Sequence, residues 1–461
     1  MKRTAILLAA LLGGCTVGPN YRAPDVPLAP AFRAPAGPTV ADAEPWWTSF
    51  HDPALNALET KALAGNLTIE QALARVDQAN AALGGVKAAR LPSATVDGSA
   101  ARAEQSLNAG LGVISKYLPS YPRTVDNGQI GVSAGWDVDF AGGLRRQQQA
   151  ALANATAAQA GVDAARAAVA AELADAYFAY RGAALQHRAY TEAVATLRDQ
   201  VQIMAARLRL GAASAQALDT AKAQLDDAQA GLPQWQAARA TEANRIAVLI
   251  AQSPSQDVAE LTPDAPLPEA AAFGADTPAA LLRNRPDLIV AEQRLIASNA
   301  QIGVALAEYY PKFSLAALLG FNSASFSTVF TGDSFNAQGA LGLHWRLFDF
   351  KRIDAEVARA RGAEREALAA YRDAVLRATE DVESGFVALD AAHARLTATL
   401  AKHAALADAL TRARKAYAVG HTSRDALITS ERAQILAESD VAAAKTAQAR
   451  AVVAVHRALG R

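Results

Sequence analysis

Sulfur is scarce in this 461-residue chain, which has one cysteine, Cys15, and two methionines, Met1 and Met204. A single cysteine excludes a disulfide framework and a zinc site built from cysteines. An excess of charge is lacking too, because 45 basic side chains balance 45 acidic ones. A neutral chain offers no electrostatic reason to bind nucleic acid, so we expect no such partner.

Motifs for catalysis are also missing. The chain contains no HExxH, no P-loop and no GxSxG, and no two of its seven histidines stand three or four residues apart, the spacing of a zinc site on a helix. We therefore expect no enzyme, no cofactor and no bound metal. A thioether relay for soft metal ions is not supported, because Met204 is the only methionine left once the N-terminus is removed.

The N-terminus has the features of a bacterial export signal. Residues 1–14 begin with basic side chains and continue with an apolar run over 5–12, which is too short to span a bilayer. Small residues precede Cys15 as in a lipobox, which predicts cleavage before Cys15 and a lipid on it. The alternative is an ordinary signal peptide. Thr16, where an aspartate would favour the inner membrane, favours retention in the outer membrane.

Two proline-free runs, 141–210 and 350–419, consist mostly of good helix formers. At about 1.5 Å per residue, roughly 70 residues make a helix about 100 Å long, several times the usual length of about 11–12 residues. Helices this long need parallel neighbours along their length. Each is followed by a shorter predicted helix, over 214–250 and 423–459.

Four other stretches alternate between apolar and small or polar residues, as strands do. They are 93–102, 129–140, 313–321 and 338–347. Strands of about 10–13 residues can cross a bilayer when they are tilted. The pattern therefore predicts two transmembrane β-hairpins, 93–140 and 312–349. A soluble β-sandwich with a buried apolar face is the alternative.

The pattern occurs twice. Trp136 and Trp345 lie 209 residues apart (345 − 136), and Pro92 and Pro311 lie 219 apart (311 − 92). Each offset recurs on its own side of the hairpin loop, as 209 also separates Gly211 from Gly420, and the first loop is ten residues longer (219 − 209). Recurring offsets indicate an internal duplication. The predicted parts are a signal peptide over 1–14, a lipidated arm over 15–52, a first repeat over 53–252, a linker over 253–277 and a second repeat over 278–461.

Four strands are too few to close a barrel, and lipid does not tolerate an open sheet edge. The chain must therefore share its sheet with copies of itself. Two copies supply eight strands and a filled lumen, whereas three supply twelve strands and room for a passage. A cyclic assembly of sheets and helices is a tube.

Several segments resemble the TolC-like outer-membrane factor family, and most closely its NodT-type efflux lipoproteins. They are CTVGPNY over 15–21, WW over 46–47, DP over 52–53, RPDL over 285–288, YPKF over 310–313 and WRLFD over 345–349. The resemblance implies a mixed α and transmembrane β fold. It implies a homotrimer with a shared 12-stranded barrel in outer-membrane lipid and a long periplasmic α-helical barrel.

The resemblance also implies a function. The trimer would be the exit channel for drugs or other toxic compounds that an inner-membrane RND pump delivers through a periplasmic adaptor. Two alternatives remain: the outer-membrane channel of a type I protein secretion system, and a periplasmic adaptor or structural coiled-coil lipoprotein.

The turns between the paired helices are the expected periplasmic mouth, where the adaptor would make contact. The residues are Gly211, Ala212, Ala213, Ser214, Tyr417, Gly420, His421, Thr422 and Ser423. The glycines could also simply end helices.

A candidate gate follows the second turn. Related sequences often place leucine and then aspartate here, whereas this chain has Asp425 and Thr429. Asp425 could form an acidic ring, with Arg424 or Arg432 reducing the repulsion between like charges. The alternative is a solvated helix face.

Overall fold

The computed structural model describes residues 16–27, 29–33, 45–118, 120–262, 266–268 and 284–460. The predicted signal peptide, Cys15 and parts of the arm and linker lie outside these ranges. The chain forms two compact units, which we describe separately. Unit 1 contains 1–24, 77–157 and 291–370, and unit 2 contains 25–76, 158–290 and 371–461.

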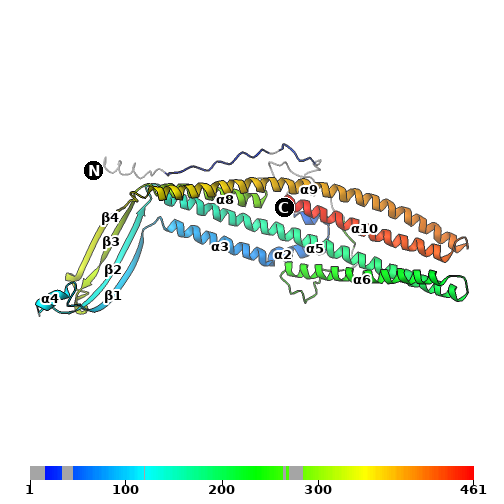
Figure 1. Cartoon of the computed structure of the whole chain (residues 1–461), viewed down its shortest axis with the longest axis horizontal. Helices are drawn as coiled ribbons and strands as arrows, with labels where there is room; N and C mark the ends of the chain where they lie inside the picture. The colour runs from blue at the N-terminus through cyan, green and yellow to red at the C-terminus, as the bar shows by residue number, and fades with distance from the viewer. Residues whose placement is uncertain are drawn as a thin grey trace. The chain divides into compact units, whose positions relative to one another are not determined.

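Unit 1 holds one antiparallel sheet in the order β1-β2-β3-β4 (Figure 1). The strands are β1 Ser93–Glu104, β2 Thr124–Val138, β3 Lys312–Ser323 and β4 Phe335–His344. Val96 pairs with Val132, which in turn pairs with Leu319. Paired residues share a face, so the predicted apolar face is continuous across the sheet. It is also uncovered, since Val96 is 72% and Leu341 72% exposed.

The strand ends differ from the prediction. β2 begins at Thr124 rather than 129, because residues 124–128 still pair with β1, as Val125 does with Ala103. β4 ends at His344, so Trp345 lies beyond it rather than in it. There the Leu347 N–H turns back to the Trp345 carbonyl at 2.9 Å, and Phe348 adopts a positive φ of 65°.

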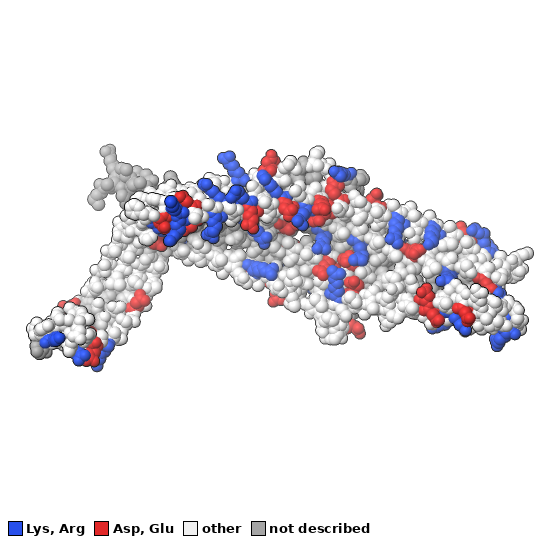
Figure 2. All heavy atoms as spheres, viewed as in Figure 1, with Lys and Arg blue, Asp and Glu red and all other residues white. Residues whose placement is uncertain are grey.

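The loop between β1 and β2 contains a short helix, α4 Gly112–Tyr117, where the sequence predicted only a loop (Figure 1). On the face shown in Figure 2, charged side chains are frequent over the helices and at the loop end of the sheet, and sparse over the strands. An uncharged, apolar sheet surface is the kind that lipid would cover.

Helices extend from the sheet. They are α3 Leu67–Ala88, α5 Gly143–Arg209, α8 Pro286–Ala307 and α9 Phe350–Ala418. The two long ones match the predicted 141–210 and 350–419 to within two residues. Within unit 1, Ala150 and Ala153 of α5 pack against Ala297 and Ala300 of α8. Small side chains bring these helix backbones close together. Among the described residues, no helix combines the length and apolarity needed to span a membrane.

Unit 2 holds the main apolar core. It is built on η1 Trp46–Phe50, α2 Pro53–Gly65, α6 Ala215–Leu249, α10 Arg424–Ala458 and the middle of α5. The sequence predicts one helix that Asp52 caps, that starts at Pro53 and that runs to about residue 90, before Pro92. That prediction is wrong, because Asn66 is extended, with ψ 127°, and separates α2 from α3. The Asn66 side chain accepts the Thr68 N–H at 2.8 Å, so it starts a new helix rather than continuing the old one.

Candidate functional site

The turn between α5 and α6 is a Schellman motif. Gly211 has φ 70°, and the Ala212 N–H donates to the Arg207 carbonyl at 2.8 Å. The Ser214 hydroxyl then accepts the Ala217 N–H at 3.1 Å and caps α6. A side chain at position 211 would be strained, so the glycine is needed for the turn itself.

The turn between α9 and α10 repeats this geometry. Gly420 has φ 73°, and the His421 N–H donates to the Ala416 carbonyl at 2.8 Å. Ser423 accepts the Ala426 N–H at 3.2 Å. The two turns are therefore built alike, and their glycines and serines are exposed.

The charged contacts near the two turns differ. Asp425 at the start of α10 forms an ion pair with Arg207 of α5. The sequence instead suggested Arg424 or Arg432 as its neighbour. Nothing in the sequence pointed to Arg207. The equivalent position in the second repeat, 209 residues later, is Ala416, so the arginine is not part of the repeated pattern. One contact thus ties the second helical hairpin to the first.

The other candidate gate residues are held elsewhere. The Arg424 guanidinium lies over the Tyr417 ring, 5.9 Å from its centroid, and 3.6 Å from Glu431. Arg432 donates to the Gln224 Oε1 at 3.1 Å. The Thr429 hydroxyl donates to the Asp425 backbone carbonyl at 2.9 Å. In the single chain, neither arginine pairs with the Asp425 carboxylate.

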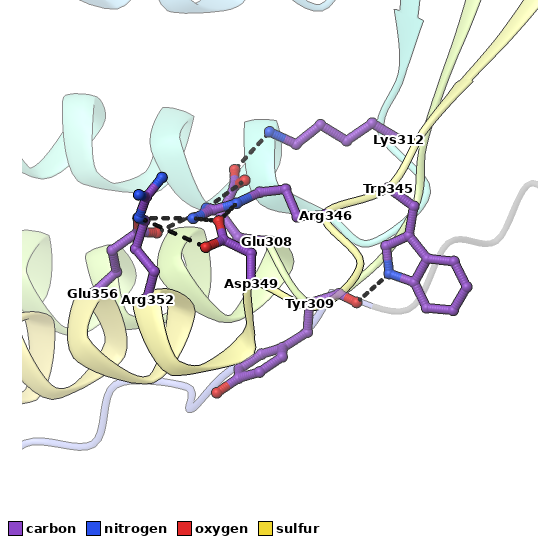
Figure 3. Close-up of polar contacts among 8 residues, drawn as sticks. All are labelled: Glu308, Tyr309, Lys312, Trp345, Arg346, Asp349, Arg352 and Glu356. Atoms are coloured by element: carbon purple, nitrogen blue, oxygen red, sulfur yellow. Dashed lines mark hydrogen bonds and ion pairs between the residues drawn. The ribbon is translucent and has the colours of Figure 1, made fainter.

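In unit 1, the junction between helices and strands is fastened by two tryptophans. The Trp136 indole N–H donates to the Arg90 carbonyl, and the Trp345 indole N–H to the Tyr309 carbonyl, both at 3.0 Å (Figure 3 shows the second). Each carbonyl lies two residues beyond the end of its helix, α3 or α8. Each indole thus fixes the point at which a helix passes into a strand.

A cluster of charges surrounds the second junction (Figure 3). Arg346 donates to Asp349 at 2.7 Å and to Glu356 at 3.1 Å, and its Nη1 lies 3.3 Å from Glu308. Glu308 also accepts from Lys312 at 2.6 Å. Hydrogen bonds from Arg346 to Glu356 and Asp349 raise the pKa of the Arg346 guanidinium. The cluster joins the end of α8, the start of β3 and the start of α9.

The N-terminal arm is attached to the other junction by Arg146 of α5. Arg146 is 3% exposed, and it donates to the Val17 carbonyl at 2.9 Å and to the Gly18 carbonyl at 2.9 Å. It also donates to the Asn20 side chain at 3.0 Å. Burial lowers the pKa of this guanidinium. Sequence reasoning missed Arg146, because most of its acceptors lie in a segment more than 120 residues away in the chain.

Replacing Arg146 with methionine is expected to release the arm while keeping the aliphatic packing of the side chain. Losing hydrogen bonds from a charged donor costs about 2 kcal/mol, which is roughly a 30-fold increase in local opening. Hydrogen exchange at residues 17–20 measures it. Arg166→Met, at an exposed site on the same helix, is the control. Equal exchange in both variants would contradict the assignment.

One unit holds a four-stranded sheet with an uncovered apolar face, and the other holds two helical hairpins with matching turns. These parts are similar to those of a TolC-like outer-membrane channel. The solved structure of the outer-membrane channel OprN matches with a TM-score of 0.83 at 30% identity, covering 97% of this chain and 99% of that one. The predicted fold class is thus confirmed.

The family model for outer membrane efflux protein matches residues 58–252 and 277–461. Nodulation protein T of Rhizobium leguminosarum bv. trifolii is 30% identical over 399 residues, 84% of this chain and 81% of that protein. The outer membrane protein OprJ of Pseudomonas aeruginosa is 28% identical over 467 residues, 99% of this chain and 95% of OprJ. The chain belongs to the outer membrane efflux protein family.

The resemblance found in the sequence is therefore confirmed. The chain is an outer-membrane efflux channel protein whose helices extend into the periplasm. These matches favour the efflux channel over the protein-secretion channel and the periplasmic adaptor. The individual roles of Cys15, the turn residues and the gate residues stay predictions.

Proposed function

We propose that three copies of this chain form the passive exit duct of a tripartite efflux system, fed by an inner-membrane RND pump through a periplasmic adaptor. The observation that supports this is the sheet, which has two open edges and an exposed apolar face within an outer-membrane efflux family. Lipid can cover the face, but only another strand can satisfy the edges.

The assembly can be tested directly. Electron microscopy of the detergent-solubilised protein is expected to show threefold particles, and the protein should fractionate with the outer membrane. Expression in a strain that lacks its own exit duct is expected to restore drug tolerance only when the matching pump and adaptor are present. A well-folded single protomer as the only species would refute the proposal.

For the cargo we propose small toxic organic compounds. Similar proteins include an antibiotic efflux pump outer membrane protein and a toluene efflux pump outer membrane protein, both of Pseudomonas putida. Another is a cation efflux system protein of Escherichia coli. Rescue with an RND drug pump, a metal pump or a type I exporter would separate these cargoes. Because such relatives are channel proteins, we further propose that this chain catalyses no reaction.

We also propose that Cys15 carries a lipid. Thr16, the next residue, packs against the helix–strand junction, where a Cβ at Gly142 would lie 2.8 Å from the Thr16 Cα. An acyl chain starting at residue 15 would begin close to the transmembrane strands. Labelling with radioactive palmitate should be lost in Cys15→Ser, and retained labelling would refute lipidation at this residue.

The two turns are proposed to meet the adaptor. Both expose small residues on a rigid Schellman turn, which suits close contact with another helical hairpin. Photo-crosslinkers at Ala212 and Thr422 are expected to capture the adaptor. A crosslinker at the exposed Glu366, in the first third of α9 and far along the helix from its turn, provides the control.

The ion pair between Arg207 and Asp425 is proposed to hold the mouth narrow. Both side chains are about one-third exposed, so the pair contributes about 1 kcal/mol, a roughly fivefold shift in the population of the separated state. Arg207→Ala is therefore expected to raise single-channel conductance in planar bilayers while keeping any preference for cations.

Asp425→Ala should raise conductance similarly, but it should also reduce cation preference, because it removes the proposed ring of carboxylates. Asp440→Ala is the matched control, since Asp440 lies on the same helix in an exposed pair with Lys402. Unchanged conductance and selectivity in Asp425→Ala would exclude Asp425 as the ring.

A further inference from the structure

The two β-hairpins of unit 1 pair their strands identically. Ser93 of β1 pairs with Gly135 of β2, and Lys312 of β3 pairs with His344 of β4. These pairs are related by the same offsets that relate the two halves of the sequence: 219 from Ser93 to Lys312 and 209 from Gly135 to His344. The two offsets found in the sequence therefore relate the strand pairing of one hairpin to that of the other.

The two hairpins meet at the seam between β2 and β3. Across this seam Gln129 pairs with Asn322, and Gly131 pairs with Gly320. The outer edges, on β1 and β4, have no strand partner in the described sheet. In a ring of copies, β4 of one copy meets β1 of the next, just as β2 meets β3 within a chain.

We propose that this seam between copies has the register of the β2–β3 seam. The inference rests on the proposed shared sheet and assigns its pairs. By the 209-residue offset, Gln338 of β4 is equivalent to Gln129 of β2. By the 219-residue offset, Ala103 of β1 is equivalent to Asn322 of β3. Gln338 therefore faces Ala103 of the partner subunit. Two residues along each strand, Ala340 faces Ala101 of the partner subunit.

The proposed register keeps the apolar face of the sheet continuous from one copy to the next. It places Leu341 and Leu343 beside Ala100 and Gly98 of the partner subunit, which lie on the same apolar face as Val96. A shift by one residue would move every apolar side chain of one strand to the opposite face. The alternation therefore excludes shifts by an odd number of residues, and the disulfide pairs described below distinguish shifts by two.

The polar face gains a contact in this register. Asp97 already accepts the hydroxyl protons of Thr95 and Ser133, each at 3.0 Å. His344 is exposed at the opposite edge of the sheet. The proposed seam brings His344 opposite Asp97 of the partner subunit, where the imidazole can donate to a carboxylate that is already oriented. Cross-strand pairs of this kind stabilise a sheet.

Engineered disulfides test the register. Four cysteine substitutions, two on β1 and two on β4, are combined into two matched pairs and two shifted pairs. The matched pairs are Ala103→Cys with Gln338→Cys, and Ala101→Cys with Ala340→Cys. The shifted pairs exchange partners: Ala101→Cys with Gln338→Cys, and Ala103→Cys with Ala340→Cys. All four side chains share one face, but a shift of two residues moves a partner by about 7 Å, beyond disulfide reach.

Cells carrying each pair are oxidised, and full-length protein is separated without reductant. Matched pairs are expected to give linked dimers and trimers at least about tenfold more abundantly than shifted pairs. Gln129→Cys with Asn322→Cys is the intra-chain control, which should close within a monomer. Single-cysteine variants account for any linkage through Cys15.

Each outcome is decisive. Linked oligomers mainly from the shifted pairs would overturn the register while leaving the shared sheet in place. If the intra-chain control closes but no edge pair links copies, both this inference and the proposed shared barrel fail. Preferential linkage of the matched pairs would establish the seam.

Discussion

Replacing Glu59 with glutamine is expected to raise the thermal unfolding midpoint at pH 7–8 and to leave it nearly unchanged at pH 4. Glu59 lies on α2 and is completely buried. Neither of its carboxyl oxygens has a hydrogen-bond partner among the described residues. Burial raises the pKa of this carboxyl from 4.5 to about 9, so the folded protein holds Glu59 as the neutral acid.

The sign of the effect follows from proton linkage. Between pH 4.5 and about 9 the folded chain binds a proton at Glu59 that the unfolded chain has released. The folded state then binds more protons, so its stability falls as the pH rises through this window. At pH 7 the cost is about 3 kcal/mol, from roughly 2.5 pH units at about 1.4 kcal/mol each. Glutamine has almost the same shape and does not titrate.

The measurement is a series of melting curves of the detergent-solubilised protein from pH 4 to pH 8.5. For a chain of this size, about 3 kcal/mol corresponds to a shift of about 3 °C. The difference between Glu59→Gln and the unaltered protein should widen steadily as the pH rises. Glu70→Gln, at an exposed position on α3, should show no such slope. Parallel pH profiles for all three proteins would show that Glu59 is ionised in the fold.

Glu59 was in fact visible in the sequence. Leu55, Leu58 and Ala62 form the apolar stripe of α2, and Glu59 falls on that stripe. An acidic residue on a buried helical face indicates either a partner or a raised pKa. Within the longer helix predicted from 53 to about 90, this short stripe is easily overlooked.

Other features were predictable to different degrees. The bounds of α5 and α9 follow from composition, because long runs without proline or clustered glycine have few other conformations available. The strand ends were less predictable, since pairing with a neighbour extended β2 at Thr124 and an indole hydrogen bond fixed Trp345 beyond β4. Local sequence does not encode such neighbours.

The contacts of the candidate site were the least predictable. Whether Asp425 meets Arg207 or Arg432 depends on which faces of four helices come together, and each of these helices has several charged faces. The turns were different, since glycine followed three residues later by serine specifies a helix end and a new cap locally. The sequence therefore located the two turns but could not identify the ion pair beside them.

The second large effect concerns two sites in unit 2 where one helix ends against the start of another. At the first, the Asn66 side-chain amide donates to the Leu249 carbonyl at 2.8 Å. At the second, the Arg285 guanidinium donates to the Ala458 carbonyl at 2.6 Å. Asn66 and Arg285 are 219 residues apart and the two carbonyls 209 apart, so the same contact is made twice with different chemistry.

Arg285→Ala is expected to destabilise unit 2 by about 3 kcal/mol, because it removes a largely buried guanidinium that donates to two carboxylates and to the Ala458 carbonyl. The Arg285 side chain is only 11% exposed and bridges Asp287 and Asp381, both at 2.9 Å. Without it, two half-exposed carboxylates lose their shared cation and the carboxyl end of α10 loses a donor. Asn66→Ala should cost less, about 2 kcal/mol, since it loses one helix cap and one neutral hydrogen bond.

Urea denaturation followed by circular dichroism ranks the variants, with Arg377→Ala as the control because its pair with Asp373 is exposed. The double variant Arg285→Ala with Asp381→Ala separates two contributions: the loss of the hydrogen bonds of Arg285, and the cost of leaving the Asp381 carboxylate without its cation. If the unpaired carboxylate dominates, removing Asp381 as well should restore about 1 kcal/mol of the free energy of unfolding, the typical coupling of neighbouring groups. If Arg285→Ala lowered the free energy of unfolding no more than Arg377→Ala does, apolar packing alone would stabilise the helix junction, and Arg285 would contribute nothing to it.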